Sequence, residues 1–325
     1  MRSFLKFAPL YQQRVWGGRG LEQALGRALP AGGSIGESWE IVDRPEAQSI
    51  VADGPLAGRT LRQLIETRAA ELMGPGWASE RRFPVLVKWL DCRDRLSLQV
   101  HPPAAVAAEL GGEPKTENWY FFQADAGAAV LAGLQPGVDA RKFAQALEHG
   151  DVEQCMCRHA TRAGDSLFIR SGVMHAIEAG NVILEIQQNS DTTYRVYDWG
   201  RAGLDGKPRA LHVRESLACL AANTAPTPQL VRAAAEAAVL AECPEFRISR
   251  RPLADGETLR FAAREQPRIL SVVEGSLRFA NPGAGNPEGS ALGCGDNILL
   301  PYASDLAFAA AGKTTVLVTD RFHHA

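Results

Sequence analysis

Short apolar segments separated by glycine- and proline-rich turns extend along most of this 325-residue chain. The segments with the length and composition of β-strands are residues 84–90, 96–101, 117–122, 166–170, 182–188, 269–273, 277–279 and 297–300. Many short strands, interrupted by helical segments, favour an antiparallel sandwich or barrel. The sequence therefore predicts a mainly β fold with helical insertions.

Several of the insertions have helix signals. Thr60 and Gln63 form a capping-box pattern ahead of apolar residues at helical spacing, and Gly74 stops the helix that they predict. Further helices are predicted at residues 103–110, from Asp139, at 212–222 and at 229–242.

Two segments far apart in the chain resemble each other. Residues 164–169 and 295–300 both begin with Gly-Asp and continue into an apolar strand. The resemblance suggests two related β domains, the second shorter, which we place at residues 1–225 and 226–325.

Composition excludes several classes of function. A charged share of 22% and a formal net charge of −2 provide no basic field for nucleic acid. The chain has no apolar run of bilayer-spanning length and begins without a signal-peptide pattern, so we expect no membrane association. None of the six cysteines forms a Cys-x-x-Cys pair, and a chain of this length needs no disulfides. We therefore expect a cytoplasmic protein with free thiols.

Residues 97–101, Ser-Leu-Gln-Val-His, alternate as a half-buried strand does. The alternating apolar residues from Leu96 onward face one side, and Gln99 and His101 face the other. An amide and an imidazole two positions apart can converge on a divalent ion such as zinc. An ordinary strand with a polar outer face is the simpler interpretation of this stretch taken alone.

Other residues can complete a metal site. His175 follows a glycine turn after the predicted strand 166–170, and Glu117 begins an aromatic strand. Together with Gln99 and His101 they form a mixed nitrogen and oxygen set, in the range that catalytic zinc accepts. As a set, these residues favour a functional interpretation over coincidence.

Several motifs give the chain a resemblance to a known family. They are residues 15–18 (VWGG), 36–39 (GESW), 96–102 (LSLQVHP), 115–120 (KTENWY), 184–198 (LEIQQNSDTTYRVYD) and 295–301. In these motifs the chain is similar to the cupin superfamily and, within it, to the short bacterial type of mannose-6-phosphate isomerase. The resemblance spans nearly the whole chain, and the motif ending in YRVYD is the most specific part.

The resemblance implies two cupin-like jelly-roll β-barrel domains with helical insertions. The first would bind one zinc ion per chain through Gln99, His101, Glu117 and His175. The second has no matching histidine ahead of its tail, so we expect no metal there. Arg170 replaces the proline that the family usually has before the turn leading to the last ligand.

The resemblance also implies isomerisation of mannose 6-phosphate and fructose 6-phosphate through an enediol or enediolate. The implied catalytic residues are Arg195, Glu185 and Lys115, and the implied substrate-binding residues are Ser97, Lys88, Lys115 and Arg195. Glu185, Lys115 and a metal-bound water are rival proton carriers. The substrate is a small sugar phosphate, and we expect a monomer or a homodimer.

Lys88 lies in the apolar run 85–90, so its ammonium group either reaches solvent or faces an anion. Three alternatives stay open: a non-catalytic cupin that binds sugar phosphates, an isomerase of another hexose or hexose phosphate, and a metal-dependent cupin oxygenase. Gln99 counts against the oxygenase, because general cupins have histidine at that position.

Overall fold

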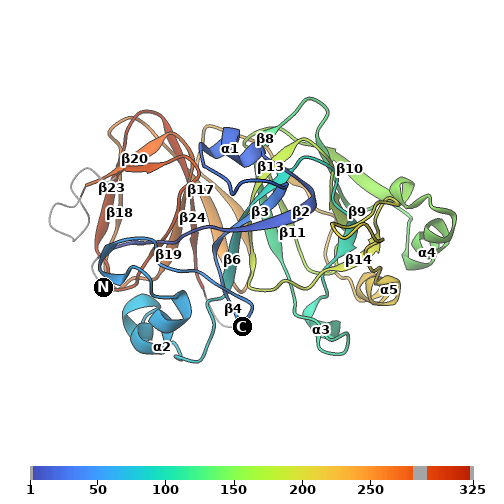
Figure 1. The fold of residues 1–325 in the computed structure, drawn as a ribbon, viewed down its shortest axis with the longest axis horizontal. Coiled ribbons are helices and arrows are strands. Elements are labelled where there is room, and N and C mark those ends of the chain that lie inside the picture. Colours follow the sequence, from blue (N-terminus) through green and yellow to red (C-terminus); the bar gives the residue numbers. More distant parts are fainter. Residues whose placement is uncertain (1–2, 281–290, 323–325) are drawn as a thin grey trace. The chain divides into compact units, whose positions relative to one another are not determined.

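The computed structural model describes residues 3–280 and 291–322. Antiparallel sheets dominate it and a few helices interrupt them (Figure 1), as the sequence predicts. Within the described ranges, each helix is too short or too polar to span a bilayer.

The chain divides into two compact units that are interleaved in sequence. The first comprises Met1–Leu10, Trp39–Leu86 and Ala234–Ala325, and the second comprises Tyr11–Ser38 and Val87–Ala233. The sequence predicts a single boundary at residues 225/226, whereas the chain passes between the units several times, for the last time at residues 233/234.

Two sheets form most of the second unit. The five-stranded sheet has the order β10 (Met156–Ala160), β9 (Ala129–Leu134), β12 (His175–Ile177), β7 (Leu98–Val100) and β14 (Tyr194–Tyr197). The seven-stranded sheet has the order β15 (Leu230–Val231), β11 (Ser166–Ile169), β8 (Glu117–Ala124), β13 (Asn181–Gln188), β6 (Val85–Cys92), β3 (Ile35–Ile41) and β2 (Leu10–Gly18).

The core of this unit lies between the two sheets. Trp119 and Phe121 of β8 pack there with Val130 of β9 and Ile177 of β12. Leu98 of β7 lies in a second cluster on the other side of the five-stranded sheet, together with residues of α4 (Ala140–His149) and α5 (Val213–Ala221). The inner strands β9 and β12 contribute buried residues to both clusters, so this part of the sheet is packed on both faces.

The first unit has a two-sheet core as well. Its six-stranded sheet has the order β1 (Leu5–Lys6), β22 (Asn297–Leu300), β19 (Arg268–Glu274), β24 (Thr314–Asp320), β17 (Arg247–Leu253) and β16 (Ala238–Glu242). Its four-stranded sheet has the order β18 (Thr258–Phe261), β23 (Leu306–Ala310), β20 (Ser276–Phe279) and β21 (Ala291–Gly293). A small hairpin joins β4 (Asp43–Arg44) and β5 (Ala47–Gln48).

Two of the predicted helices begin where the sequence places them. Thr60 and Gln63 form the capping box of α2 (Leu61–Leu72), and Asp139 accepts a hydrogen bond from the Lys142 N–H at the start of α4. The remaining helical segments are short: α1 (Gly20–Leu25), η1 (Gly54–Leu56), α3 (Ala104–Ala107) and η2 (Val152–Cys155).

Two local predictions are wrong. Residues 229–242 are rich in alanine but are not helical, because Leu230–Val231 pairs with β11 and Ala238–Glu242 pairs with β17. Long-range strand pairing overrides helix propensity here. The second wrong prediction is that Leu96 and Leu98 face the same side of one strand. Leu96 precedes β7 and packs in the cluster between the sheets, whereas Leu98 packs in the cluster near α4 and α5.

The glycine motifs let two chain segments approach closely. A Cβ atom on Gly17 would lie 2.4 Å from the Gly36 nitrogen, and a Cβ atom on Gly36 would lie 2.5 Å from Cβ of Arg14. Only glycine fits at such distances. The close approach brings Arg14 beside Glu37 at the edge of the site described next.

Candidate active site

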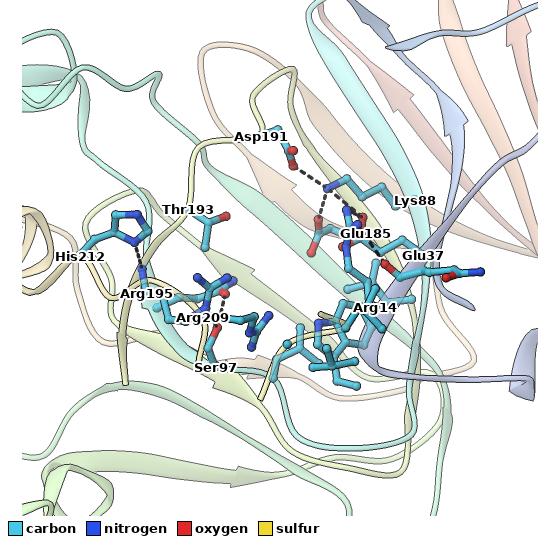
Figure 2. Close-up of a pocket in the computed structure, with 18 of the residues that line it drawn as sticks. Arg14, Glu37, Lys88, Ser97, Glu185, Asp191, Thr193, Arg195, Arg209 and His212 are labelled. Atoms are coloured by element: carbon cyan, nitrogen blue, oxygen red, sulfur yellow. Dashed lines mark hydrogen bonds and ion pairs between the residues drawn. The ribbon is translucent and has the colours of Figure 1, made fainter. Parts of the chain in front are cut away.

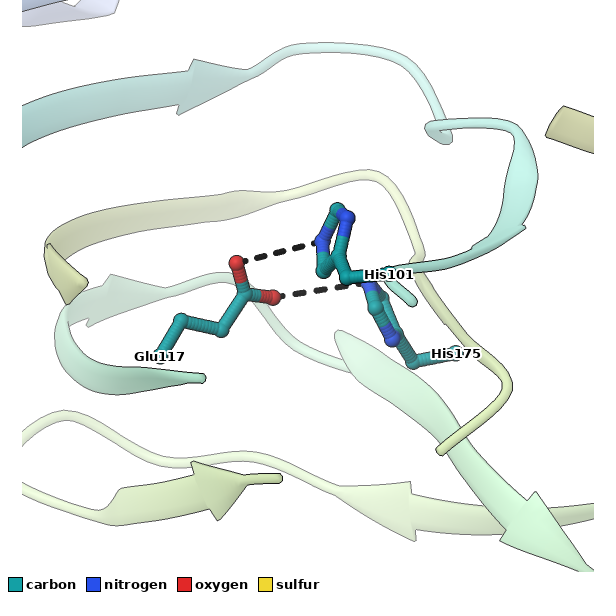
Figure 3. Close-up of side chains that lie close together, drawn as sticks. All are labelled: His101, Glu117 and His175. Carbon is teal, nitrogen blue, oxygen red and sulfur yellow. Dashed lines mark ion pairs between the residues drawn. The ribbon is translucent and has the colours of Figure 1, made fainter. Parts of the chain in front are cut away.

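Three buried side chains from separate parts of the second unit meet at one point (Figure 3). His101 follows β7, Glu117 begins β8 and His175 begins β12. Nε2 of His101 lies 3.3 Å from Oε2 of Glu117, and Nε2 of His175 lies 3.4 Å from Oε1. Each side chain is about 1% exposed, so solvent does not screen the group.

Backbone carbonyl groups orient both imidazoles. Nδ1 of His101 lies 2.8 Å from the Thr192 oxygen, and Nδ1 of His175 lies 2.9 Å from the Val173 oxygen. Because a carbonyl group only accepts, each Nδ1 carries the proton and each Nε2 presents a lone pair toward Glu117. Metal-binding histidines are commonly oriented in this way.

The protonation states also suit a cation. Burial lowers the pKa of His175 to about 3 and, together with Lys115, lowers the pKa of His101, so both rings are neutral. Burial raises the pKa of Glu117, but the ammonium group of Lys115 outweighs it and holds this pKa well below its usual range. Two neutral imidazoles and one carboxylate form a donor set that fits a divalent metal.

Glu117 lacks the hydrogen bonds that a buried carboxylate needs. Neither of its oxygen atoms accepts a hydrogen bond of normal geometry from a described residue, although Nζ of Lys115 lies 2.7 Å from Oε2. Lys115 offsets the charge at Oε2, whereas Oε1 has no donor among the described residues, and a buried acceptor without a donor is costly. A divalent cation between Glu117 and the two Nε2 atoms would satisfy all three groups.

Gln99 lies beside this group. Its backbone pairs with His175 on one side and with Arg195 on the other, and its Nε2 atom lies 3.3 Å from Nε2 of His175. Ser97 donates a hydrogen bond to Oε1 of Gln99 over 3.2 Å. The strand pairing of β7 therefore brings the fourth predicted ligand and the predicted arginine to the same place.

Lys115 and Glu185 form a second buried pair next to Glu117. Nζ of Lys115 lies 3.7 Å from Oε1 of Glu185, and Trp119 donates a hydrogen bond to Oε2 of Glu185 over 3.0 Å. Burial raises the pKa of Glu185, and Lys115 opposes this rise only in part. Burial alone lowers the pKa of Lys115, but Glu117 and Glu185 more than offset this and raise it. Of the two buried carboxyl groups beside Lys115, Glu185 is therefore the one whose pKa is raised, whereas the pKa of Glu117 is lowered.

A cavity of about 600 Å³ leads to these residues (Figure 2). Its lining includes all five predicted substrate and catalytic residues, together with Gln99 and several residues that sequence reasoning missed. The predicted residues are Lys88, Ser97, Lys115, Glu185 and Arg195, and the missed polar residues include Arg14, Glu37, Asp191, Thr193, Asp205, Arg209 and His212. All of them belong to the second unit.

Carboxylates surround Lys88 on one side of this cavity. Its Nζ atom lies 3.8 Å from both Glu37 and Glu185 and 3.7 Å from Asp191. Lys88 is 3% exposed, so its ammonium group faces anions rather than solvent. Of the two alternatives for Lys88, reaching solvent or facing an anion, the structure supports the second. The anions are carboxylate groups of the protein itself.

Arg195 and Arg209 lie on the other side of the cavity, near Ser97, in the view of Figure 2. Arg195 donates hydrogen bonds to Oγ of Ser97 over 3.3 Å and to the Ala210 oxygen over 3.0 Å. Arg209 binds Asp198 through two nitrogen atoms, at 2.7 and 2.5 Å. Burial lowers the pKa of Arg195, and the positive charge of Arg209 lowers it further. An excess of positive charge is suited to an anion such as phosphate.

The fold and the site together define a class. This is a mainly β protein with a buried His–Glu–His group that can hold a metal, beside a cavity lined by ionised side chains. The class comprises metal-binding enzymes that act on small polar molecules.

Comparisons with known proteins specify the family. The family model described as phosphomannose isomerase type I, catalytic domain, matches residues 4–124. The mannose-6-phosphate isomerase of Streptococcus mutans is 36% identical over 90% of this chain and 92% of its own length. Mannose-6-phosphate isomerase ManA of Bacillus subtilis is 32% identical over 92% of this chain and 93% of its own.

A solved structure shows the same fold. The crystal structure of the mannose 6-phosphate isomerase from Bacillus subtilis superimposes with a TM-score of 0.84 at 29% identity, covering 98% of this chain and 99% of that one. The chain belongs to the mannose-6-phosphate isomerase family, which confirms the resemblance stated from the sequence motifs.

Proposed function

We propose that the chain is a zinc-dependent aldose–ketose isomerase that interconverts mannose 6-phosphate and fructose 6-phosphate through an enediolate. The names of its relatives support this choice of substrate. The observation that carries the proposal is that Gln99 and Lys115 connect the charged cavity with the buried His–Glu–His group. Both line the charged cavity, and both contact the buried His–Glu–His group.

We assign one zinc ion per chain to Gln99, His101, Glu117 and His175. A half-turn of the Gln99 amide presents its oxygen atom where its nitrogen now faces His175. The bound ion supplies a Lewis acid that stabilises negative charge growing on a substrate oxygen. The orientation of both imidazoles and the lack of a hydrogen-bond donor at Oε1 of Glu117 support the assignment.

Isomerisation moves a proton between C2 and C1 of the sugar while the carbonyl group shifts. We assign this transfer to Glu185, because a general base works best when its pKa is close to the operating pH. The burial that raises its pKa supports the choice. Trp119 holds one carboxylate oxygen, which leaves the other oriented toward Lys115 and Lys88.

Lys115 acts as a hydrogen-bond donor to oxygen rather than as the base. Its carboxylate neighbours raise its pKa, so it keeps its proton. An ammonium group between Glu117 and Glu185 can donate a hydrogen bond to an oxygen on which negative charge grows.

The phosphate group binds at the arginine side of the cavity, to Arg195, Arg209 and Ser97. A phosphate of about −1.5 to −2 charges needs an excess of cations over carboxylates. Arg195 forms no ion pair with a described carboxylate, and Arg209 shares the carboxylate of Asp198 with Arg201. Lys88 lies among three carboxylates and is the poorer partner for phosphate. We assign Lys88 to the sugar hydroxyl groups, which a lysine can bind without losing its ion pairs.

Replacing Arg209 with alanine is expected to raise KM for mannose 6-phosphate by about 10- to 100-fold, the value of one charged hydrogen bond. Isomerisation of unphosphorylated mannose, where it can be measured, should change little. Arg201→Ala is the matched control, because Arg201 also pairs with Asp198 but does not line the cavity. Equal losses in the two variants, or equal losses with both sugars, would remove Arg209 from phosphate binding.

The function itself is tested by a coupled assay that follows fructose 6-phosphate formed from mannose 6-phosphate. We expect turnover with mannose 6-phosphate that exceeds turnover with free mannose and with other hexose 6-phosphates. Binding of mannose 6-phosphate without turnover would instead support the non-catalytic sugar-phosphate-binding cupin. Faster turnover of another sugar would identify the chain as an isomerase of that hexose or hexose phosphate.

We also propose that the second unit is the metal-binding catalytic cupin domain and that the first is a cupin-like domain without metal. The placement of every cavity residue in the second unit supports this division. All six cysteines are free thiols, which is consistent with the cytoplasm. A monomer or homodimer that acts on a small sugar phosphate, without nucleic acid or membrane, remains our expectation.

A further inference from the structure

Arg195 lies on an edge of a sheet. Strand β14 is the last strand of the five-stranded sheet, and its Arg195 is paired with Gln99 on the inner side. On the outer side the backbone N–H and C=O groups of Arg195 have no neighbouring strand in that sheet. An edge strand of this kind is held less firmly than a central one.

Residue 212 takes the place of the absent strand. The backbone N–H of His212 donates to the Arg195 oxygen over 2.7 Å, and the Arg195 N–H donates to Nδ1 of the His212 ring over 3.3 Å (Figure 2). In an antiparallel ladder, two paired residues exchange two hydrogen bonds, each from the backbone N–H of one residue to the backbone C=O of the other. Here an imidazole nitrogen supplies the acceptor that a backbone carbonyl would otherwise provide.

The ring of His212 is held in this position by its surroundings. His212 is the N-cap residue of α5, yet its side chain makes no capping hydrogen bond and contacts Arg195 instead. The Ser216 N–H donates to the His212 oxygen over 2.9 Å, and the ring lies 5.8 Å from the ring of Tyr194. The start of α5 is therefore anchored to β14 through His212, and the Ser216 hydroxyl adds a hydrogen bond to the Tyr194 oxygen over 3.4 Å.

The same segment also holds the Arg195 side chain. The Ala210 oxygen accepts a hydrogen bond from the guanidinium group over 3.0 Å, two residues before His212. Residues 210–212 thus contact both the backbone and the side chain of Arg195, in addition to its contacts with Gln99 and Ser97. A shift of this stretch would move the guanidinium group relative to the cavity.

We propose that His212 is a positioning residue, whose Nδ1 atom fixes the backbone of Arg195 so that its guanidinium group meets the substrate. The inference rests on the role given to Arg195 under the proposed function. A displacement of about 1 Å in a group that contacts the reacting molecule can cost about 100-fold in rate.

Three variants of His212 test the proposal. Phenylalanine keeps the ring and removes the acceptor, asparagine keeps an acceptor at the position of Nδ1, and glutamine offers one only at the position of Nε2. We expect His212→Phe to lower kcat/KM for mannose 6-phosphate by about 10- to 100-fold. His212→Asn should retain activity within about threefold of the unmodified chain, and His212→Gln should lose about tenfold, since only the former replaces the hydrogen bond.

A double-variant cycle separates positioning from general stability. His212→Phe should cause no further loss when Arg195 is already alanine, because it acts through Arg195. An equal loss in both backgrounds, full activity of His212→Phe, or an asparagine variant as impaired as the phenylalanine one would overturn the proposal. If thermal melts show that His212→Phe does not fold, the other two variants test the proposal. A higher kcat/KM for His212→Asn than for His212→Gln supports it, and the reverse order overturns it. Full activity of Arg195→Ala alone would instead refute the role of Arg195 in the proposed function, and the inference with it.

Discussion

Replacing Arg195 with alanine is expected to lower kcat/KM for mannose 6-phosphate by about 10²- to 10⁴-fold. Two charged hydrogen bonds to phosphate or to the enediolate, at about 1.5–3 kcal/mol each, account for this range. The folded state should be little affected, because Arg195 is only half-buried and its protein contacts are to Ser97 and the Ala210 oxygen. Coupled assays and urea unfolding of the same preparations measure the two effects.

The lysine variant is the control for charge at this position. Arg195→Lys keeps a cation but loses the planar pair of donors, so its activity should fall between that of the alanine variant and that of the unmodified chain. An alanine variant with unchanged kcat/KM would remove Arg195 from the chemistry. A lysine variant with full activity would show that charge alone is needed there.

Glu117→Gln is expected to abolish metal retention and to lower kcat by more than about 100-fold. Replacing groups that only orient metal ligands costs about 10- to 100-fold, so loss of a ligand charge should cost more. The substitution keeps the shape of the side chain, but it removes the carboxylate that faces both imidazoles and pairs with Lys115. Metal content by mass spectrometry and turnover in the coupled assay report the two losses.

Glu185→Gln provides a matched control for this experiment. It makes the same chemical change in a buried carboxylate that also contacts Lys115, but Glu185 is not an assigned ligand. This variant should keep its metal and lose turnover. If both variants lose metal, or if neither does, the division between ligand and proton carrier is wrong.

Local sequence patterns predicted the parts of the fold that depend on nearby residues. The capping box at Thr60, the helix from Asp139 and the aromatic strand that begins at Glu117 are all present. The helix predicted at 229–242 is absent, because its alanine content says nothing about the distant strands with which it pairs. Interleaved units are likewise invisible to local patterns, since they depend on which distant segments pack together.

In the candidate site, too, some residues could be predicted from the sequence and others could not. Gln99 and His101 stood out because they share the polar face of one predicted strand, and the family motifs added Glu117 and His175 as ligands. The structure brings all four together. Arg209 and His212 carried no such signal. Their significance comes from Asp198 and from the outer edge of β14, and these contacts exist only in the folded chain.

The central claim is that a single divalent cation held by four side chains of the second unit is needed for turnover. Its most direct measurement is the rate of mannose 6-phosphate isomerisation in protein stripped by a chelator, titrated with zinc while bound metal is counted. We predict that the stripped protein is inactive and that activity returns in proportion to occupancy, reaching its maximum at one zinc per chain. Full activity in protein shown to be free of metal would contradict the account.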